Sequence, residues 1–364
     1  LVERLHRRDI TVTGVTKATL GSPDIARALL KAGIGDLGDS RIENIEAMRR
    51  AQVPAQMSLI RAPMPSQAKR VVMNADISFN TEISTIRRLA CEAHALGRTH
   101  GVVLMVELGD LREGIMPDEV LATVGEILNL PNIVFKGIGT NLACRSGVCP
   151  DDDNMEVLSR LVESVEATFG ISVDIISGGN SANLHWAENG DYTGRINNLR
   201  LGESILLGCE TLDRTPIEGL HQDAITVIAE VIESNTKPTK PIGRLAQCAF
   251  GETTTPIDRG HITQTIFAIG MQDIDPTGLR PPAGTSIIGC SSDHLITSSK
   301  GKCLAIGTEM VFRLGYNALL RAMTSPFVKK SITPANNLAH GNEIIISSCA
   351  TRIESYKKIS QQLP

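Results

Sequence analysis

The stretch Ile10-Thr-Val-Thr-Gly-Val-Thr-Lys17 decides how the first half of this chain is interpreted. It is a β-branched run that ends on a single lysine, and Gly21-Ser-Pro23 follows before a helical pattern begins. These features predict a buried strand and a turn into a helix. At the carboxyl end of that strand, partial burial would lower the pKa of the Lys17 amine and free its lone pair for nucleophilic attack. The alternative is a lysine whose stem lines the strand while its ammonium reaches solvent.

Outward from this strand, short β-rich runs alternate with amphipathic helical patterns as far as residue 208. Eight such units in about 200 residues predict an α/β fold with an N-terminal (β/α)8 barrel of the TIM type. A doubly wound open sheet is the competing architecture, because alternation alone does not show closure. The predicted strands are 10–17, 36–40, 57–62, 76–81, 101–108, 133–141, 172–177 and 196–201.

The pattern changes after Glu218. A connecting helix is predicted at 219–229, and short alternating segments separated by Pro and Gly then predict a C-terminal antiparallel β domain. The expected domains are a barrel at 1–215, the β domain at 216–330 and a tail at 331–364 to which no fold is assigned. The predicted β segments are 247–251, 261–269, 285–290, 303–306 and 310–314.

Composition excludes several classes of function. The net charge of −4 offers no basic field for nucleic acid, and an aromatic content of 3 % leaves little for base stacking. No apolar run approaches the roughly 20 residues that span a bilayer. Cys144 and Cys149 are close in sequence, but no second pair completes a zinc site, so we expect no metal. Free thiols and the lack of a signal-peptide core favour the cytoplasm.

Two glycine-bearing turns follow the seventh and eighth predicted strands. Ser177-Gly-Gly-Asn-Ser181 would let backbone N–H groups approach phosphate oxygens, and Asn198-Leu-Arg-Leu-Gly-Glu203 follows next. Phosphate sites of eightfold barrels are often built from these two loops. A flexible loop, and a structural ion pair for Arg200, are the alternatives. Together with Lys17, the turns point to pyridoxal 5′-phosphate (PLP) held as a Schiff base.

Residues 10–327 also resemble a known family, the alanine racemase group of fold type III PLP enzymes, and most closely its ornithine racemase-like branch. Five motifs in the same order carry the resemblance. They are Val15-Thr-Lys17 with Gly21, Gly38-Asp-Ser-Arg-Ile-Glu-Asn-Ile45, Ser177-Gly-Gly-Asn-Ser181, Leu199-Arg-Leu-Gly-Glu-Ser-Ile-Leu-Leu-Gly208 and Gly289-Cys-Ser-Ser-Asp-His294.

The resemblance implies that Lys17 forms the Schiff base and that Arg200 faces the pyridine nitrogen. Arg112 matches the arginine at the pyridine hydroxyl, and Asn141 stands where alanine racemases usually carry a histidine. The cofactor-binding residues implied in this way are Lys17, Arg112, Asn141, Asn180, Ser181, Arg200, Gly202 and Glu203.

This sequence departs from the family on the opposite face of the cofactor. Racemisation needs a second acid/base there, and alanine racemases use a tyrosine from the partner subunit's β domain. Phe250 occupies the matching position and cannot carry a proton. Asp293 and His294 lie in a loop that reaches the same site in the family, so His294 is the candidate second base, unless it only orders that loop. Phe327 likewise replaces an expected tyrosine.

The resemblance therefore implies a cytoplasmic homodimeric racemase that interconverts L- and D-amino acids, with ornithine or a related diamino acid favoured. Asp110, Glu113 and Glu252 are candidates to bind the second ammonium of such a substrate. The alternatives are a PLP aldolase of the same fold and a PLP-binding protein without turnover. We expect a small-molecule substrate and no nucleic-acid or membrane partner.

Overall fold

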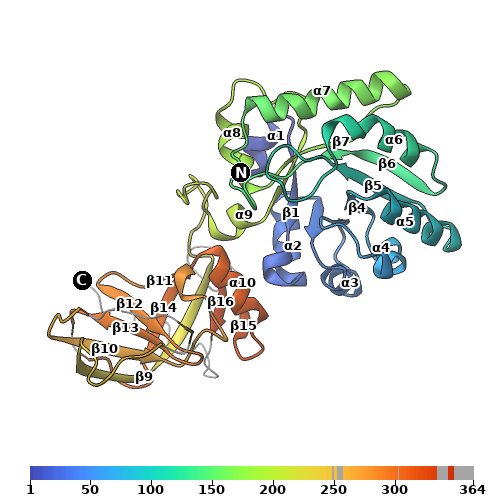
Figure 1. The fold of residues 1–364 in the computed structure, drawn as a ribbon. Coiled ribbons are helices and arrows are strands. Elements are labelled where there is room, and N and C mark those ends of the chain that lie inside the picture. Colours follow the sequence, from blue (N-terminus) through green and yellow to red (C-terminus); the bar gives the residue numbers. More distant parts are fainter. Residues whose placement is uncertain (248–249, 252–256, 302, 334–342, 348–364) are drawn as a thin grey trace. The chain divides into compact units, whose positions relative to one another are not determined.

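The computed structural model describes residues 1–247, 250–251, 257–301, 303–333 and 343–347. Contacts divide the chain into two compact units, Leu1–His221 and Gln222–Pro364. Each unit is described by itself (Figure 1).

The first unit contains a closed barrel of eight strands that pair in chain order, with the last strand paired to the first. All pairs are parallel, and Thr13 of the first strand lies opposite Arg200 of the eighth. The predicted barrel is thus confirmed, and an open sheet is excluded. The strands are β1 (Thr11–Val15), β2 (Asp36–Asp39), β3 (Gln56–Leu59), β4 (Ile77–Asn80), β5 (His100–Met105), β6 (Ile133–Gly139), β7 (Ile175–Gly179) and β8 (Asn198–Leu201).

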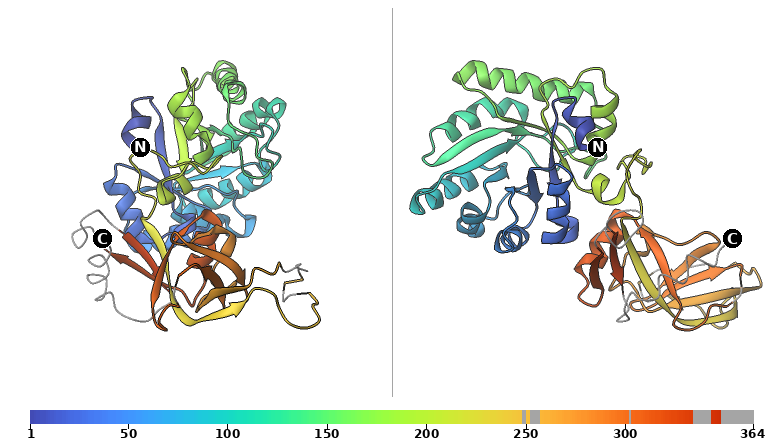
Figure 2. Two further views of the ribbon diagram at one scale, coloured as in Figure 1. Left: turned by 90° about the vertical axis from the view of Figure 1, so that its left-hand side faces the viewer. Right: turned by 180° about the vertical axis from the view of Figure 1, so that it is seen from behind.

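Helices follow the strands and cover the outside of the barrel (Figure 2). In α7, Asp151 caps the first turn by accepting a hydrogen bond from the Asn154 N–H at 2.9 Å, while Met155, Leu158 and Val162 turn inward. The helices are α1 (Val2–His6), α2 (Pro23–Lys31), α3 (Ile42–Arg50), α4 (Ala68–Asn74), α5 (Ile83–Ala95), α6 (Val120–Leu128), α7 (Asp152–Phe169), α8 (Leu184–Asn189) and α9 (Glu203–Leu207).

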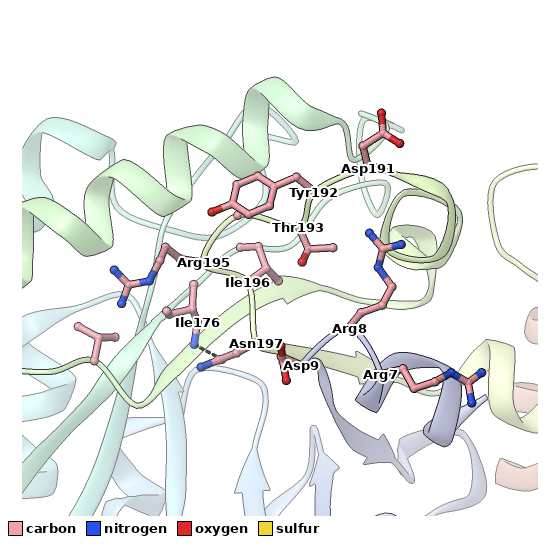
Figure 3. Close-up of a pocket in the computed structure, with 12 residues that line it drawn as sticks. Arg7, Arg8, Asp9, Ile176, Asp191, Tyr192, Thr193, Arg195, Ile196 and Asn197 are labelled. Atoms are coloured by element: carbon pink, nitrogen blue, oxygen red, sulfur yellow. Dashed lines mark hydrogen bonds between the residues drawn. The ribbon is translucent and has the colours of Figure 1, made fainter.

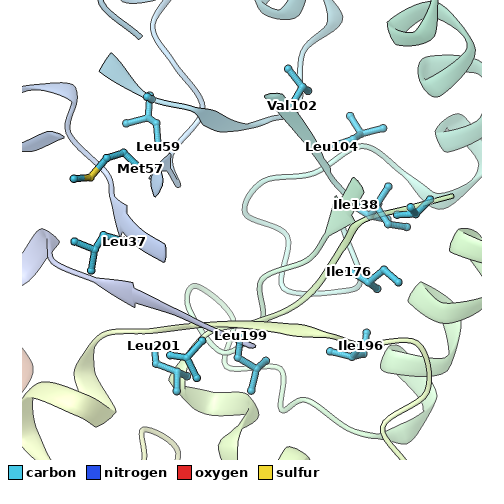
Figure 4. Close-up of a cluster of buried hydrophobic side chains, with 14 of the residues drawn as sticks. Leu37, Met57, Leu59, Val102, Leu104, Ile138, Ile176, Ile196, Leu199 and Leu201 are labelled. Atoms are coloured by element: carbon cyan, nitrogen blue, oxygen red, sulfur yellow. The ribbon is translucent and has the colours of Figure 1, made fainter. Parts of the chain in front are cut away.

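The main hydrophobic core lies between the strands and this helical layer. Leu37, Met57, Leu104, Ile138 and Leu199 project outward from their strands into it (Figure 4). Because successive side chains of a strand point to opposite faces, the residues between them line the barrel interior. One part of that interior is apolar and is formed by Ile77, Phe79, Val103 and Met105 with Ile60 and Ile175.

The second unit is built on a curled, mainly antiparallel sheet in the order β11-β14-β9-β10-β13-β12. Phe267 and Phe312 meet edge to face inside it, with ring centroids 5.3 Å apart. The predicted antiparallel domain is confirmed. Its elements are β9 (Ile225–Pro238), β10 (His261–Phe267), β11 (Leu279–Arg280), β12 (Thr285–Cys290), β13 (Leu295–Ser299), β14 (Glu309–Leu314), α10 (Tyr316–Thr324), β15 (Lys329–Thr333) and β16 (Glu343–Ser347).

Three details of this unit differ from the sequence prediction. The helix expected at 219–229 is wrong, because Ile225–Pro238 forms the long strand β9. The strand expected at 303–306 is absent from the described residues there, and Leu295–Ser299 pairs instead. In the unassigned tail, β15 and β16 pair with each other, and β16 runs parallel to β9. The segment expected at 247–251 lies partly outside the described residues.

Candidate active site

Lys17 begins the 3-10 turn η1 (Lys17–Thr19) directly after strand β1. The preceding residue anchors this turn, since Thr16 Oγ1 donates to Asp39 Oδ2 at 2.7 Å. Gly21 closes the turn with a φ of +62°, and a Cβ at this position would lie 2.6 Å from Asn44 Cβ. Both the backbone conformation and the close approach therefore require glycine. The sequence locally fixes the lysine at the carboxyl mouth of the barrel.

The Lys17 amine is electrostatically unusual. Burial lowers its pKa below the ordinary lysine value; the nearby Cys144 thiol and Asp39 carboxylate act to raise the pKa, while the Arg112 and Arg200 guanidinium groups lower it further. A lysine with a lowered pKa has a larger neutral fraction near pH 7, and only the neutral amine is nucleophilic. This environment favours a reactive lysine over one that merely reaches solvent.

Arg112 is held by the loop after β5. The buried Glu107 carboxylate accepts hydrogen bonds from the backbone N–H groups of Gly109, Leu111 and Arg112 at 2.6, 2.9 and 3.1 Å. The Arg112 guanidinium in turn donates to Cys144 Sγ at 2.8 Å and pairs with Glu113 at 2.5 Å. The carboxylate therefore shapes the loop that presents the arginine.

The neighbouring carboxylate of Asp110 fixes the loop after β6. It is fully buried and accepts hydrogen bonds from the N–H groups of Cys144, Arg145 and Ser146 at 3.2, 2.8 and 3.0 Å. Burial acts to raise the pKa of Asp110, but these hydrogen bonds lower it below the ordinary value. Asp110 is thus committed to the loop and Glu113 to Arg112, which leaves neither well suited to a substrate ammonium. Glu252 lies outside the described residues.

Hydrogen-bond donors converge at the loops after β7 and β8. The Ser181 hydroxyl oxygen accepts hydrogen bonds from the N–H groups of Gly202 and Ser204 at 3.4 and 3.2 Å. It also accepts one from the Ser204 hydroxyl at 2.9 Å. A Cβ on Gly202 would lie 3.1 Å from Val15 Cβ, so the backbone packs closely against β1. The Glu203 side chain pairs with Arg214, which leaves the backbone of Glu203 for the cradle. Such a set of donors suits a phosphate group.

Arg200 lies 5 % exposed inside the barrel mouth. Its Nη1 donates to Ser177 Oγ at 2.5 Å, its Nη2 donates to Thr140 O at 2.7 Å, and its guanidinium stacks 5.0 Å above the Phe79 ring. Among described residues it forms no ion pair with a carboxylate, so the interpretation as a structural ion pair is wrong. Burial lowers its pKa to about 10, which keeps it protonated at neutral pH.

Asn141 carries the unsatisfied polar group of the site. Its Oδ1 accepts from Asn180 Nδ2 at 3.2 Å and from Arg200 Nη2 at 3.3 Å. Its Nδ2 is buried and donates to no described atom, and the nearby Thr140 Oγ1 is also buried without a described partner. Buried polar groups are normally hydrogen-bonded. These orphaned groups beside the phosphate donors fit a polar cofactor.

The predicted site residues therefore fall into two groups. Those from the barrel lie at the carboxyl ends of its strands, and they are Lys17, Arg112, Asn141, Asn180, Ser181, Arg200, Gly202 and Glu203. Asp293 and His294 belong to the second unit, in the turn between β12 and β13. There the His294 N–H donates to Ser291 Oγ at 3.2 Å, and Asp293 accepts from Gln272 at 2.7 Å.

Two phenylalanines mark the departures from the family. Phe250 is half exposed and Phe327 is 74 % exposed in the second unit. Among the described residues, no cluster of three or more His, Cys, Asp or Glu side chains could hold a metal ion. The same residues include no helix with the length and apolarity needed to cross a bilayer.

Sequence reasoning missed the residues that support this site. The sequence assigned no role to Asp39 or Glu107, and Cys144 was considered only as half of an incomplete zinc pattern. The usable signal was their position at or just after the carboxyl ends of predicted strands, where a barrel places functional groups. The bonds that join Asp39 to Thr16 and Cys144 to Arg112 are long-range and have no sequence signature.

A cavity of about 600 Å³ lies at the opposite end of the barrel (Figure 3). Arg8 and Arg195 line it, but Arg8 donates to the carbonyls of Glu188 and Gly190, and Arg195 pairs with Glu166 at 3.0 Å. Its walls precede strands β1, β7 and β8. Because catalytic groups of such barrels lie at the carboxyl ends, this cavity is separate from the candidate active site.

Comparison with known proteins agrees with this geometry. Residues 1–209 match the family model described as alanine racemase, N-terminal domain. The chain belongs to this family. It is 37 % identical to lysine racemase of Thermotoga maritima over 92 % of this chain and 94 % of that protein. It is also 37 % identical to ornithine racemase of Acetoanaerobium sticklandii, over 87 % of this chain and 91 % of that protein.

The fold alone does not distinguish a racemase from other members. D-threonine aldolase from Filomicrobium marinum superposes with a TM-score of 0.69 at 14 % identity, covering 90 % of this chain and 85 % of that protein. A shared fold hosts different reactions. The two racemases, similar over nearly their whole length, identify this family member as an amino-acid racemase, an isomerase.

Proposed function

We propose that this racemase uses PLP, bound to Lys17, and acts on a diamino acid such as ornithine or lysine. One observation carries the cofactor assignment: a half-buried lysine of lowered pKa shares a barrel face with the Ser181 cradle and Arg200. The racemases named for lysine and ornithine, each 37 % identical, support the substrate class.

The barrel residues have distinct tasks toward the cofactor. The Ser181 hydroxyl and the N–H groups of Gly202 and Glu203 would hold the phosphate, and Arg112 the phenolic oxygen. PLP, when bound, supplies an electron sink that makes the Cα proton of an attached amino acid acidic. Arg200 stays protonated, so it would donate to the pyridine nitrogen and leave that nitrogen without a proton. A weaker sink restrains competing reactions and favours return of the proton to Cα.

Inversion requires proton carriers on both faces of Cα. Lys17 Nζ would take or return the proton on one face. We assign the opposite face to the His294 imidazole of a partner subunit, since Phe250 lacks a titratable group. A homodimer in which each β domain completes the other subunit's site follows from this assignment. If His294 only orders its turn, replacing it will leave racemisation intact.

The cofactor assignment has a direct test. Purified protein incubated with PLP should be yellow, and Lys17→Ala should abolish that absorbance band. Ser164→Ala, on the exposed face of α7 with its hydroxyl bonded to Arg160 O, is a matched control for handling and folding. Colour that survives Lys17→Ala would overturn the Schiff-base role of the lysine.

Deuterium exchange in heavy water, followed by chiral analysis, tests the reaction and the substrate. L-ornithine and L-lysine should exchange at Cα with inversion, and L-alanine much more slowly. Exchange without inversion would show that the second acid/base is missing. No exchange with any amino acid would favour a PLP-binding protein, and metal-dependent cleavage of a β-hydroxy amino acid would favour the aldolase.

The free cysteines bear on where the enzyme works. The six described cysteines, Cys91, Cys144, Cys149, Cys209, Cys290 and Cys303, form no disulfide. Unpaired thiols persist in a reducing compartment. We propose the cytoplasm on this ground, and cell fractionation of the native protein will test it.

A further inference from the structure

A chain of five polar side chains runs through the barrel interior from the active site to the far end of β2. Arg200 Nη1 donates to Ser177 Oγ at 2.5 Å, and Ser177 Oγ donates to Asn198 Oδ1 at 2.7 Å. Asn198 Nδ2 donates to Thr13 Oγ1 at 3.0 Å, and Thr13 Oγ1 donates to Asp36 Oδ2 at 2.6 Å. We call these five residues the Arg200–Asp36 chain.

Strand register makes this chain possible. Thr13 lies opposite Arg200 on one side and Asp36 on the other, so β8, β1 and β2 present these side chains at neighbouring positions. The residues next to them, Val12 and Leu199, belong to the core outside the barrel, so the chain itself faces inward. The polar side of the interior is thus built by alternation and shear of adjacent strands.

Every hydrogen bond in the chain has the same direction. Each member accepts from the side of Arg200 and donates toward Asp36, so a guanidinium stands at the donor end and a carboxyl group at the acceptor end. Hydrogen bonds aligned in this way polarise one another and strengthen together in a low-dielectric interior. The Asp36 charge therefore polarises the hydrogen bond that Arg200 donates, although the two groups are not in contact.

The Arg200 guanidinium and the Asp36 carboxylate carry opposite charges at the two ends of the chain. Arg200 is buried and forms no ion pair with a described carboxylate. Burial raises the pKa of Asp36 to about 6, against hydrogen bonds from Thr13 and Ser58 that lower it, while the carboxylate of Asp76 raises it further. Asp36 is thus mainly ionised at pH 7 and becomes neutral just below that. Asp76 itself is bound by Arg49 at 2.5 Å.

We propose that Asp36 is a positioning residue which, through Thr13, Asn198 and Ser177, fixes the orientation and donor strength of Arg200 toward the cofactor ring. This inference rests on the proposed function, because it assigns Arg200 to the ring nitrogen. Asp36 contacts neither cofactor nor substrate. Its charge sets the polarity of the chain from the end of the barrel opposite the active site.

The consequence is a pH response that originates outside the active site. Protonation of Asp36 removes the negative acceptor, and the carboxylic acid can donate back to the chain. The alignment from Thr13 to Ser177 then weakens, and Arg200 is held less firmly toward the ring. The arrangement predicts stronger cofactor binding when Asp36 is ionised.

The spectrum of bound PLP tests this step on the full-length holoenzyme. In the wild type, the absorbance band should titrate with a midpoint near pH 6, the pKa of Asp36. Asp36→Asn and Thr13→Val should abolish that transition and weaken PLP binding roughly threefold to tenfold, the effect of one lost hydrogen bond. Thr168→Val, the same change on the exposed face of α7, should leave the transition in place. An unchanged titration in Asp36→Asn would overturn the proposal.

A double-mutant cycle on the cofactor-free chain separates this inference from the proposed function. Asp36 and Ser177 lie on different strands with two side chains between them, so independent effects on melting temperature would simply add. The chain predicts that Asp36→Asn combined with Ser177→Ala lowers the melting temperature by less than the sum of the single losses. Additive losses would overturn the chain. Failure of the wild type to take up PLP would contradict the proposed function, while this cycle would still decide the inference.

Discussion

Thr16 Oγ1 donates to the buried carboxylate of Asp39 at 2.7 Å, and this bond joins the carboxyl ends of the first two barrel strands. Asp39 also accepts from the Arg41 N–H and from Asn44 Nδ2, each at 2.9 Å. Burial nevertheless raises the pKa of Asp39. The turn that begins with Lys17 is therefore supported by the Asp39 carboxylate, whose ionised form is stabilised by these hydrogen bonds.

Thr16→Val should loosen this turn. It keeps the side-chain shape and removes the hydroxyl, so Asp39 loses a buried donor at a cost of about 1–3 kcal/mol in unfolding free energy. The pKa of Asp39 should rise further, and PLP should dissociate faster. Thr16→Ser, which keeps the hydroxyl, is the matched control. Denaturant unfolding and cofactor release measure the two effects, and equal behaviour of the two variants would contradict the role of this bond.

The rate of PLP capture should depend on pH through the Lys17 amine. Burial lowers its pKa, so the neutral amine is lost as pH falls through a value below that of an ordinary lysine. Arg112 lowers the pKa further. Arg112→Ala should therefore move the midpoint of the rate–pH profile upward.

Stopped-flow absorbance on the cofactor-free chain measures that midpoint. Arg41→Ala is the control, because the exposed Arg41 side chain is not among the groups that shift the Lys17 pKa, and alanine keeps the backbone N–H that bonds Asp39. A midpoint that stays in place in Arg112→Ala would show that this guanidinium does not act on the lysine amine.

The parts of the site that the sequence predicts are those encoded by a few neighbouring residues. The buried strand before Lys17 and the glycine turn ending at Ser181 are read over a few residues, and both were predicted. The helix expected at 219–229 failed because Leu220, Ile225 and Ile228 fit a helical period, whereas pairing with β10 and β14 makes Ile225 onward a strand.

Long-range partners could not be predicted in this way. A carboxylate partner was the alternative prediction for Arg200, but Arg200 bonds Ser177 and Thr140, which are brought to it by closure of the barrel. The sequence predicted no role for Asp36, because an acidic residue at the start of a strand usually faces solvent. Only the register of β1 against β2 and β8 reveals that it ends a buried chain.

Gly137→Ala should destabilise the barrel severely. Gly137 has a φ of +155° at the register shift where β6 pairs with β5, and an added Cβ would overlap the carbonyl group of Ile175. Backbone cannot move aside cheaply, so we expect a loss of about 3 kcal/mol or more. Gly125→Ala, in helix α6, is the control with the opposite expected sign. Its Cβ would lie 3.4 Å from the Phe169 ring, and the higher helix propensity of alanine should raise the free energy of unfolding by at most about 1 kcal/mol. Melting temperatures that fall equally in the two variants would contradict the steric role of Gly137.

Mixing two inactive variants tests the proposed sharing of sites between subunits. Lys17→Ala lacks the lysine and His294→Ala lacks the candidate second base, so each homodimer should be nearly inactive. If a site combines Lys17 of one subunit with His294 of the other, every mixed dimer has one intact site and one doubly defective site. Random exchange makes half of the dimers mixed, so activity should recover to about a quarter of the wild-type value.

The same mixing experiment distinguishes the alternative arrangement. If both groups of a site come from one subunit, every site in the mixture stays defective and no activity returns. Light scattering establishes in parallel that dimers form, and energy transfer between differently labelled subunits establishes that subunits exchange. Lys17→Ala mixed with Ser164→Ala should keep about half of the wild-type activity in either arrangement, so this mixture controls for losses caused by mixing itself. Full activity of His294→Ala alone would show that His294 is not the second acid/base and that another group at the barrel mouth carries the proton.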